Sequence, residues 1–367
     1  MKLDGDLFAV ARRKGLLMTA VIELTYRCDL ACEVCYNDRS RSRKPLTIDE
    51  HVALFEELAD LQVLNLVFTG GEPSLHPRFL ELGRHARRLG FALRIKTNGM
   101  RMDRTMAEIL RREVDPFVID VSLHGATAVT HDRQTRKRGS FDRIVRNLVS
   151  MKEEGLRVRL SGLLTSWNEH ELEAMQALAD RLEMDIIFDC SPTPRDDGDR
   201  SPMVLAPSPD AVRRVLELQL DRHGPPQVKA SESGTREQSG PFDGSVCSAG
   251  YSTMAVDPYG DVLPCVNWRR PVGNIGDQSI REIWQSTGEL RRVRELNSQA
   301  LRVLTRHELE AGLMGFCPGL AHSISGNELE IYPSALQRAQ LQLEVMDRSR
   351  APDPAKRPER DQNRPAP

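Results

Sequence analysis

The segment VIELTYRCDLACEVC, residues 21–35, places three of the chain's seven cysteines directly after a strand-like run. Outward from this segment, apolar or β-branched runs alternate with helix-like segments. The predicted strands are 20–25, 63–69, 92–97, 117–123, 157–165 and 185–189. This alternation predicts a parallel sheet, either an open one or a partial (β/α) barrel. The cysteine loop then lies at the C-terminal edge of the sheet, where α/β folds carry their active sites.

Terminal signals delimit the helices between these strands. Thr47 and Glu50 form a capping-box pattern at the start of a helix over 47–61. Gly90 is the expected C′ residue of the helix that follows the second strand. Further helices are predicted over 140–155 and over 168–183, the second with Asn168 as its cap.

Composition bounds the class of protein. The 367 residues are 40% hydrophobic with a net charge of −2, so composition does not favour nucleic-acid binding. No run approaches the roughly 18 apolar residues of a membrane span, and the N-terminus lacks the order of a signal peptide. We expect a cytoplasmic protein with no membrane partner, in which clustered cysteines serve as metal ligands or redox groups.

The composition changes after the sixth predicted strand. Residues 191–245 are rich in Pro, Gly, Ser and charge around one predicted helix, 209–223. A second unit follows, with a β-hairpin turning at 258–261 and helices over 279–287 and 336–346. The expected organisation is a lead-in (1–18), a main domain with linker (19–240), a small second domain (241–345) and a disordered tail (346–367).

Cys28, Cys32 and Cys35 have the spacing of an incomplete metal site. Zinc sites usually take four ligands in paired CxxC form, and no fourth ligand is nearby. Four thiolates normally hold a four-iron cluster. Three thiolates would leave one iron open for a small molecule.

The CxxxCxxC pattern resembles the radical S-adenosylmethionine (SAM) superfamily. The resemblance implies a partial (β/α)6 TIM-type barrel and a [4Fe-4S] cluster that binds SAM on its open iron. It also implies reductive cleavage of SAM to methionine and a 5′-deoxyadenosyl radical, which abstracts a substrate hydrogen. One departure is local: the residue before the third cysteine, often aromatic in the family, is Val34, and Tyr36 follows Cys35.

The resemblance assigns cofactor-binding roles at the ends of the later strands. The segment TGGEP, 69–73, matches the part of the family that binds the amino group of SAM. Arg136, in preference to Arg133, is expected at the SAM carboxylate, with a solvated basic loop as the alternative. His124 either contacts SAM or substrate or is structural. The implied cofactor-binding residues are Gly70, Gly71, Glu72, Asn98, Ser122, His124, Arg136 and Thr165.

A second set of cysteines lies in the second unit. Cys247, Gly260 and Cys265 follow the pattern C-x12-G-x4-C, and Cys317 comes later. The pattern resembles the SPASM and twitch extensions of radical SAM enzymes, small α+β domains that hold auxiliary [4Fe-4S] clusters. The resemblance implies one auxiliary cluster on these three cysteines, because no cysteine lies between Cys265 and Cys317. Three unrelated free thiols are the alternative.

Cys190 has three possible roles: a fourth auxiliary ligand, a hydrogen-atom donor, or a core cysteine. If Cys190 is not a ligand, the fourth iron is left to His322, a carboxylate, water or substrate.

For the reaction, the resemblance implies oxidative modification of a ribosomally made peptide, such as a crosslink. The alternatives are redox-neutral epimerisation with Cys190 as donor, and action on a small natural product or sugar. A non-catalytic electron carrier is a further alternative. Expected partners are a precursor peptide, a separate leader-binding protein, and a flavodoxin- or ferredoxin-type electron donor. Asp196, Asp197 and Asp199 are expected to be solvated turn residues.

Overall fold

The computed structural model describes residues 10–11, 14–38, 40, 43–224, 246–306 and 315–350. Six strands form the main sheet: β1 (Thr19–Thr25), β2 (Asn65–Gly70), β3 (Ala92–Thr97), β4 (Val118–Ser122), β5 (Val158–Leu163) and β6 (Asp185–Asp189). All six pair in parallel and in chain order. The predicted strands therefore form, with ends shifted by at most two residues.

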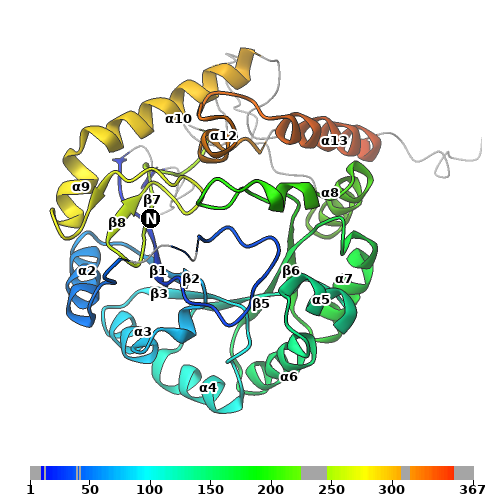
Figure 1. Cartoon of the computed structure of the whole chain (residues 1–367), viewed down its shortest axis with the longest axis horizontal. Coiled ribbons are helices and arrows are strands. Elements are labelled where there is room, and N and C mark those ends of the chain that lie inside the picture. The colour runs from blue at the N-terminus through cyan, green and yellow to red at the C-terminus, as the bar shows by residue number, and fades with distance from the viewer. Residues whose placement is uncertain are drawn as a thin grey trace, which may run out of the picture.

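Helices follow one another around the outside of this curved sheet (Figure 1). They are α2 (Ile48–Asp60), α3 (Phe79–Arg88), α4 (Arg104–Ile109), α5 (Ala128–Thr135), α6 (Ser140–Glu153), α7 (Leu172–Arg181) and α8 (Pro209–His223). Short turns lie between them: η1 (Pro73–Leu75), η2 (Leu110–Val114), η3 (Glu169–Glu171) and η4 (Ser201–Leu205). This is the partial TIM-type barrel that the sequence predicted.

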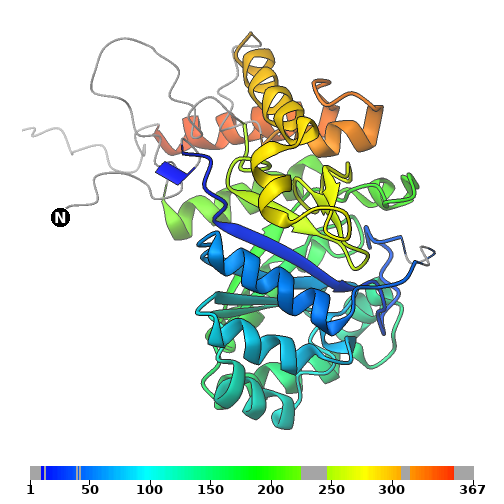
Figure 2. The ribbon, with the colours of Figure 1, turned by 90° about the vertical axis from the view of Figure 1, so that its left-hand side faces the viewer.

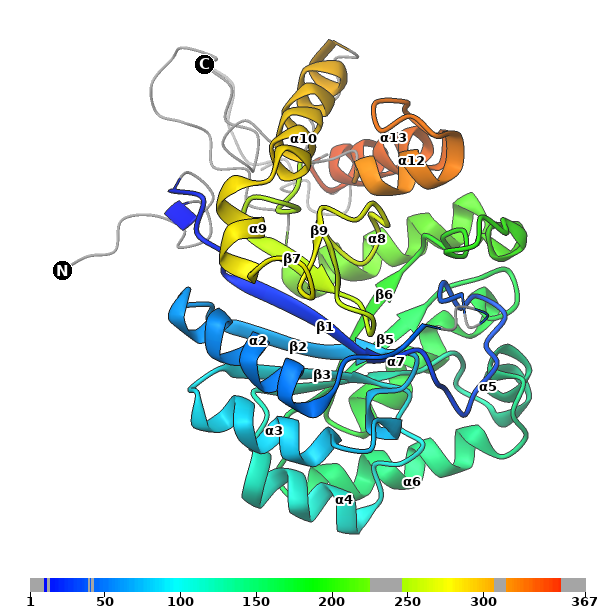
Figure 3. The ribbon, with the colours of Figure 1, turned by 60° about the vertical axis from the view of Figure 1, so that its left-hand side comes forward.

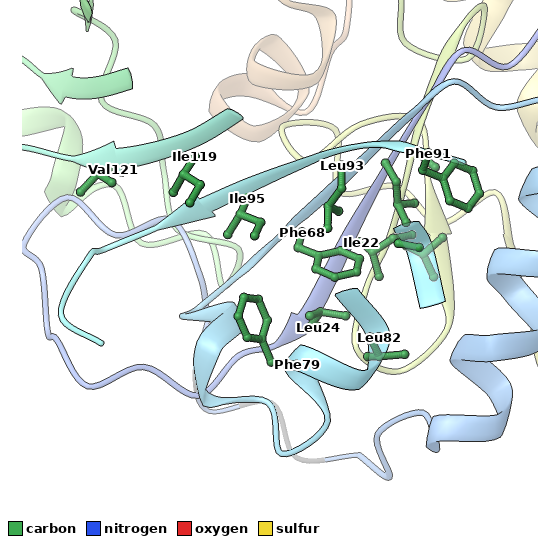
Figure 4. Packing of buried hydrophobic residues seen from close by; sticks show 14 of the residues in the cluster. Ile22, Leu24, Phe68, Phe79, Leu82, Phe91, Leu93, Ile95, Ile119 and Val121 are labelled. Carbon is green, nitrogen blue, oxygen red and sulfur yellow. The ribbon is translucent and has the colours of Figure 1, made fainter. Parts of the chain in front are cut away.

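The core lies between the sheet and this helical layer. Alternate strand residues point outward, because successive side chains of a strand face opposite sides. Figure 4 shows Ile22, Phe68 and Ile95 on the side that meets Phe79 and Leu82 of α3. Each of these strand side chains is fully buried, and burial of one such side chain contributes about 1.5–3 kcal/mol.

The second unit continues the same sheet. It contains β7 (Thr253–Val256), β8 (Asp261–Leu263), β9 (Gly273–Asn274), α9 (Ile280–Ser286), α10 (Gly288–Arg306), α12 (Pro318–Ser325) and α13 (Pro333–Arg350). Strand β7 pairs in parallel with β1, and β8 and β9 add in antiparallel order. Figures 2 and 3 show α10, α12 and α13 gathered beyond this edge of the sheet. The two units thus share one nine-stranded sheet.

The predicted helix and turn signals have mixed outcomes. The reciprocal Thr47–Glu50 capping box forms, and Gly90 adopts φ +84° after α3. Asn168 takes the N-cap position of η3, which leads into α7, but makes no side-chain capping bond: its side-chain oxygen accepts from the backbone N–H of Thr165 at 2.7 Å. The patterns also missed α4, α5, α10 and α12.

Two of the predicted unit boundaries can be compared with the described residues. The boundary near residue 240 lies outside the described residues. Helix α13 continues to Arg350, past the residue 346 at which the tail was expected to begin. None of the described helices is both long enough and apolar enough to cross a membrane.

Candidate active site

The first cysteine loop lies at the C-terminal end of β1. Cys28, Cys32 and Cys35 are half-buried, and the backbone N–H of Cys35 donates to the carbonyl of Cys32 at 3.2 Å. The end of α5 holds this loop, because Ala31 and Glu33 donate backbone hydrogen bonds to the last residues of that helix. The three thiols are therefore presented by a loop whose backbone is fixed on the barrel rim.

Arg195 holds the same loop from the opposite side. Its guanidinium donates to the carbonyl of Cys35 at 2.8 Å and to that of Glu33 at 2.9 Å. Arg195 belongs to the segment after β6, so the first and last strands of the barrel converge on the cysteine loop.

Two glycines let the end of β2 approach β1 closely. A Cβ on Gly70 would lie 2.4 Å from the carbonyl oxygen of Thr25, and one on Gly71 would lie 2.5 Å from that of Arg27. These contacts accompany backbone hydrogen bonds from Gly71 to Thr25 at 2.7 Å and from Glu72 to Arg27 at 2.8 Å. Only glycine permits this approach, which places the 70–72 segment beside Cys28.

Glu72 links the ends of β2 and β3. Its buried carboxylate accepts from the Ser74 hydroxyl at 2.6 Å, from the Thr97 hydroxyl at 2.9 Å and from the Asn98 N–H at 2.8 Å. Burial raises the pKa of Glu72, while these hydrogen bonds act in the opposite direction. The carboxylate is thus occupied within the protein and orients the strand ends.

Asn98 reaches back to the cysteine loop. Its side-chain amide donates to Asp29 at 2.8 Å and approaches the Cys28 sulfur at 3.7 Å. The Thr97–Gly99 turn therefore lies against the first ligand candidate, as the strand-end argument requires.

The ends of β4 and β5 carry the next predicted residues. Ser122 is half-buried, and the hydroxyl of the fully buried Thr165 donates to the Gln134 side chain at 2.9 Å. Burial lowers the pKa of His124 to about 4, so its imidazole is neutral at physiological pH. His124 is 5.8 Å from His131 between ring centroids.

Glu171 fixes the loop that carries His124, and the sequence patterns assigned it no such role. Its carboxylate accepts from the Ala126 N–H at 2.6 Å and from the Thr127 and Thr130 hydroxyls at 2.6 Å each. An acidic side chain at a helix N-terminus stabilises the helix through its unpaired N–H groups and dipole. No local sequence pattern could reveal this role, because Glu171 comes 41 residues after Thr130 in the chain.

The two candidate arginines have other partners here. Arg136, in the left-handed region at φ +53°, forms an ion pair with Glu33 of the cysteine loop. The Arg133 guanidinium stacks 3.9 Å above the Trp167 ring. Neither arrangement tests a contact with the SAM carboxylate, which stays a prediction for Arg136.

The second set of cysteines comes together from three segments. Cys247 precedes β7, Cys265 follows β8, and Cys317 caps the N-terminus of α12. Burial raises the pKa of Cys265 to about 12, and the nearby charges of Cys317 and Cys247 add to this effect. The fold therefore brings together thiols that are 70 residues apart in sequence (Cys247 to Cys317).

Each of these sulfurs accepts a hydrogen bond. Cys247 accepts from the Asn297 side chain at 3.3 Å, Cys265 from the Asn267 N–H at 3.3 Å, and Cys317 from the Leu320 N–H at 3.4 Å. Hydrogen bonds to sulfur are typical of cluster-ligating thiolates and tune their potential. Both cysteine sets thus fit iron-sulfur ligation.

A single-ion site is a separate matter. Within the described part of the chain, no three His, Cys, Asp or Glu side chains are arranged to hold one metal ion. That finding does not bear on a cluster, because each thiolate of a cluster binds a different iron.

Cys190 directly follows β6 and is half-buried. It packs between α8 and α13, against Val212, Leu216 and Leu341. Burial raises its pKa to about 12, and the nearest charges that act on it are those of Arg338 and Asp189. These surroundings are those of a core cysteine.

A buried ion-pair network joins the two cysteine regions, and the sequence patterns did not predict it. Arg269, four residues after Cys265, makes a bidentate ion pair with Glu23 of β1 at 2.6 and 2.9 Å. Its Nε donates to Asp196 at 2.9 Å. The hydroxyls of Tyr26 and Tyr36 also donate to Glu23, which is fully buried.

The expectation that Asp196 is solvated is therefore wrong. Its side chain is 5% exposed because it pairs with Arg269. Asp199 instead pairs with Arg195 at the exposed surface, and Asp197 is exposed.

A cavity of about 200 Å³ lies between the two cysteine regions. Tyr36 lines it from the first cysteine loop, Asp196 from the segment after β6, Asn267 and Arg269 from the loop after Cys265, and His322 from α12. His322 is 3.4 Å from Glu328. The cavity therefore opens to side chains from both units.

Comparisons with known proteins agree with this geometry. A model of the radical SAM superfamily matches residues 22–179, and a model of the iron-sulfur cluster-binding SPASM domain matches residues 247–309. The mycofactocin maturase MftC of Mycobacterium tuberculosis (strain CDC 1551 / Oshkosh) is 30% identical over 289 residues, which cover 75% of this chain and 72% of that protein. The chain belongs to the radical SAM superfamily.

Two further relatives align over most of their length. The PqqA peptide cyclase of Xanthomonas axonopodis pv. citri (strain 306) is 26% identical over 94% of this chain and 95% of that protein. The AdoMet-dependent heme synthase of Methanosarcina barkeri (strain Fusaro / DSM 804) is 28% identical over 86% and 95%.

Solved structures share the fold. SuiB of Streptococcus suis, bound to its precursor peptide SuiA, superposes with a TM-score of 0.62 at 18% identity, covering 80% of this chain and 72% of that one. The anSMEcpe structure with bound AdoMet gives 0.64 at 16% identity, covering 90% and 99%. This radical SAM protein is an enzyme that uses SAM and [4Fe-4S] clusters.

Proposed function

We propose that this radical SAM enzyme oxidatively modifies a ribosomally made peptide, forming a crosslink or a related product at a C–H bond. The observation that carries the proposal is the cavity between two cysteine regions on one sheet. A substrate there would lie within reach of both clusters. The names of the relatives support a peptide, since they include a maturase, a peptide cyclase and AlbA, a biosynthesis protein of the bacteriocin subtilosin.

The proposed roles follow the geometry. Cys28, Cys32 and Cys35 would hold the SAM cluster, and Cys247, Cys265 and Cys317 would hold the auxiliary cluster. Bound together, the first cluster and SAM supply the radical that abstracts a substrate hydrogen.

The protein's own residues position and enclose this chemistry. The backbone of the 70–72 segment would bind the SAM amino group, because the Glu72 carboxylate is already occupied. Asn98, Ser122 and Thr165 would lie beside the adenosine part of SAM, together with the neutral His124. Arg136 would bind the SAM carboxylate. The Arg269 network would hold the wall between the two clusters.

The oxidative reaction is preferred over epimerisation because of Cys190. A hydrogen-atom donor has to reach the substrate radical, whereas Cys190 packs against apolar side chains of α8 and α13. A core role explains its position. The fourth auxiliary ligand is then His322, a carboxylate, water or substrate.

The proposed partners are the precursor peptide, a separate leader-binding protein, and a flavodoxin- or ferredoxin-type electron donor.

A second candidate is action on a porphyrin, favoured by the long alignment with the AdoMet-dependent heme synthase. This candidate function would use the same barrel and the same radical step, and only the substrate would differ.

One experiment tests both candidates. The anaerobically reconstituted enzyme is reduced and given SAM with either a precursor peptide encoded beside its gene or an iron porphyrin. We expect 5′-deoxyadenosine and a peptide that has lost two hydrogen atoms by mass spectrometry. A peptide of unchanged mass that gains deuterium in heavy water would instead show epimerisation, and a modified porphyrin would establish the second candidate.

A further inference from the structure

Strand β3 points a lysine into the inside of the barrel. Leu93, Ile95 and Thr97 are buried, and Figure 4 shows Leu93 and Ile95 on the helix side of the sheet. Because strand side chains alternate, Lys96 faces the inner side. It is exposed although β3 has a paired strand on each side, so solvent reaches it only from within the ring.

Other residues on the inner face of the sheet are exposed too. Ser161 of β5 pairs in register with Ile187 of β6, and both are exposed, Ile187 by 47%. Asp189, two residues beyond Ile187, is exposed as well. The inner face of the sheet is therefore open to solvent at β5 and β6 as well as at Lys96.

The nearby acidic groups are already engaged. Asp120, opposite Lys96 in register, forms ion pairs with both Arg94 and Arg159. Asp189 accepts the Ser191 N–H at 2.9 Å. Across the described ranges, Lys96 itself takes part in no ion pair and in no side-chain hydrogen bond.

The surroundings of the Lys96 ammonium favour the binding of an anion. The walls of the ring desolvate the ammonium, and this effect, followed by the Arg94 charge, lowers the pKa of Lys96, while Asp120 and Asp189 act in the opposite direction. A carboxylate that reaches the exposed ammonium would form a charge-assisted hydrogen bond with it.

Lys96 also lies next to the strand-end residues that are proposed to bind SAM. It precedes Thr97 and Asn98 directly, and its register partner Asp120 is two residues before Ser122. A group bound at Lys96 would therefore be held under the edge where the radical forms.

We propose that Lys96 binds a carboxylate of the substrate inside the barrel, either an acidic side chain or a C-terminal carboxylate. The inference rests on the proposed function, because it requires part of the substrate to extend from the cavity between the cysteine regions to the inner face of the sheet. It adds a chemical class that the proposed function lacks: the substrate carries an anionic group near the reacting carbon. The SAM carboxylate is the other source of the same chemistry.

The test observes Lys96 directly in the cluster-loaded enzyme. Reductive methylation with ¹³C-formaldehyde labels lysine amines and keeps their charge, and the Lys96 resonance is assigned by its loss in Lys96→Arg. Butyrate is titrated against butyramide, which has the same size without the charge. We expect butyrate to move the Lys96 resonance with SAM already bound, at a concentration about tenfold lower than butyramide requires.

Each other outcome overturns the proposal. A resonance that moves with SAM and no further with butyrate assigns Lys96 to the SAM carboxylate. A resonance that responds to neither ligand makes Lys96 a solvated residue. The Lys152 resonance is the control: this lysine pairs with Glu183 at the surface and should not respond. Since no turnover is needed, butyrate binding without any peptide product would contradict the proposed function alone.

Discussion

The two cysteine regions are built in opposite ways. Cys28, Cys32 and Cys35 lie within eight residues of one loop, on the rim of a barrel made from local βα units. Cys247, Cys265 and Cys317 come from a loop, a hairpin end and a helix start that are distant in sequence. The first region depends on close backbone approach, whereas the second depends on the packing of separate elements. The two should therefore fail differently when they are altered.

The largest contrast is expected from removing one ligand of each set. Cys28→Ala should abolish 5′-deoxyadenosine release, because the open iron that SAM needs is lost. Cys247→Ala should keep SAM cleavage and stop product formation. Iron content and 5′-deoxyadenosine, measured on the same samples, check both. Full SAM cleavage by the Cys28→Ala variant would contradict the different roles assigned to the two cysteine regions.

A second test targets the close approach at the first region. Gly71→Ala places a Cβ 2.5 Å from the Arg27 carbonyl, so the strand ends have to separate. We expect SAM cleavage to fall at least tenfold, with the auxiliary cluster retained. Gly288→Ala is the matched control, since its Cβ would meet only the Arg291 side chain at 3.8 Å. Equal losses in the two variants would contradict a specific role for the approach.

The bridge between the regions can be tested with neighbouring arginines. Arg269→Gln leaves Glu23 buried without its cation, which should cost about 3–5 kcal/mol of stability. Arg270 forms more exposed pairs with Glu289 and Glu328, so Arg270→Gln should cost about 0–1 kcal/mol. Thermal unfolding measures both. The ratio of 5′-deoxyadenosine to product should also rise in Arg269→Gln alone, and unchanged coupling would limit Arg269 to stability.

The smallest effect is expected at Cys190. Cys190→Ala removes a partly buried sulfur between α8 and α13, and the expected cost is about 1 kcal/mol. Iron content should equal that of the unaltered enzyme. A loss of auxiliary-cluster iron would make Cys190 the fourth ligand after all, and a loss of product with full iron would restore the donor role.

Much of the fold followed from local patterns. Six strands and five of the helices around them (α2, α3, α6, α7 and α8) were predictable because these βα units carry their own period and cap signals, whereas α4 and α5 were not predicted. Asn168 makes no side-chain cap because its amide bonds elsewhere: its oxygen accepts from the N–H of Thr165, three residues earlier, and its NH2 group donates to the His124 carbonyl after β4. Helix α10 was missed, although its buried residues Leu290 and Val293 pack into the main core.

The candidate site divides in the same way. The sequence by itself determined the first cysteine loop and the glycine segment, because their residues are neighbours in the chain. Tertiary structure decided what long-range packing controls: the gathering of Cys247 with Cys265 and Cys317, the packing of Cys190 against α8 and α13, and the pairing of Arg269 with Glu23. Lys96 depends on both the sequence and the tertiary structure. Its strand was predictable, but its solvent contact on the inner side of a partial barrel appears only when the sheet curves.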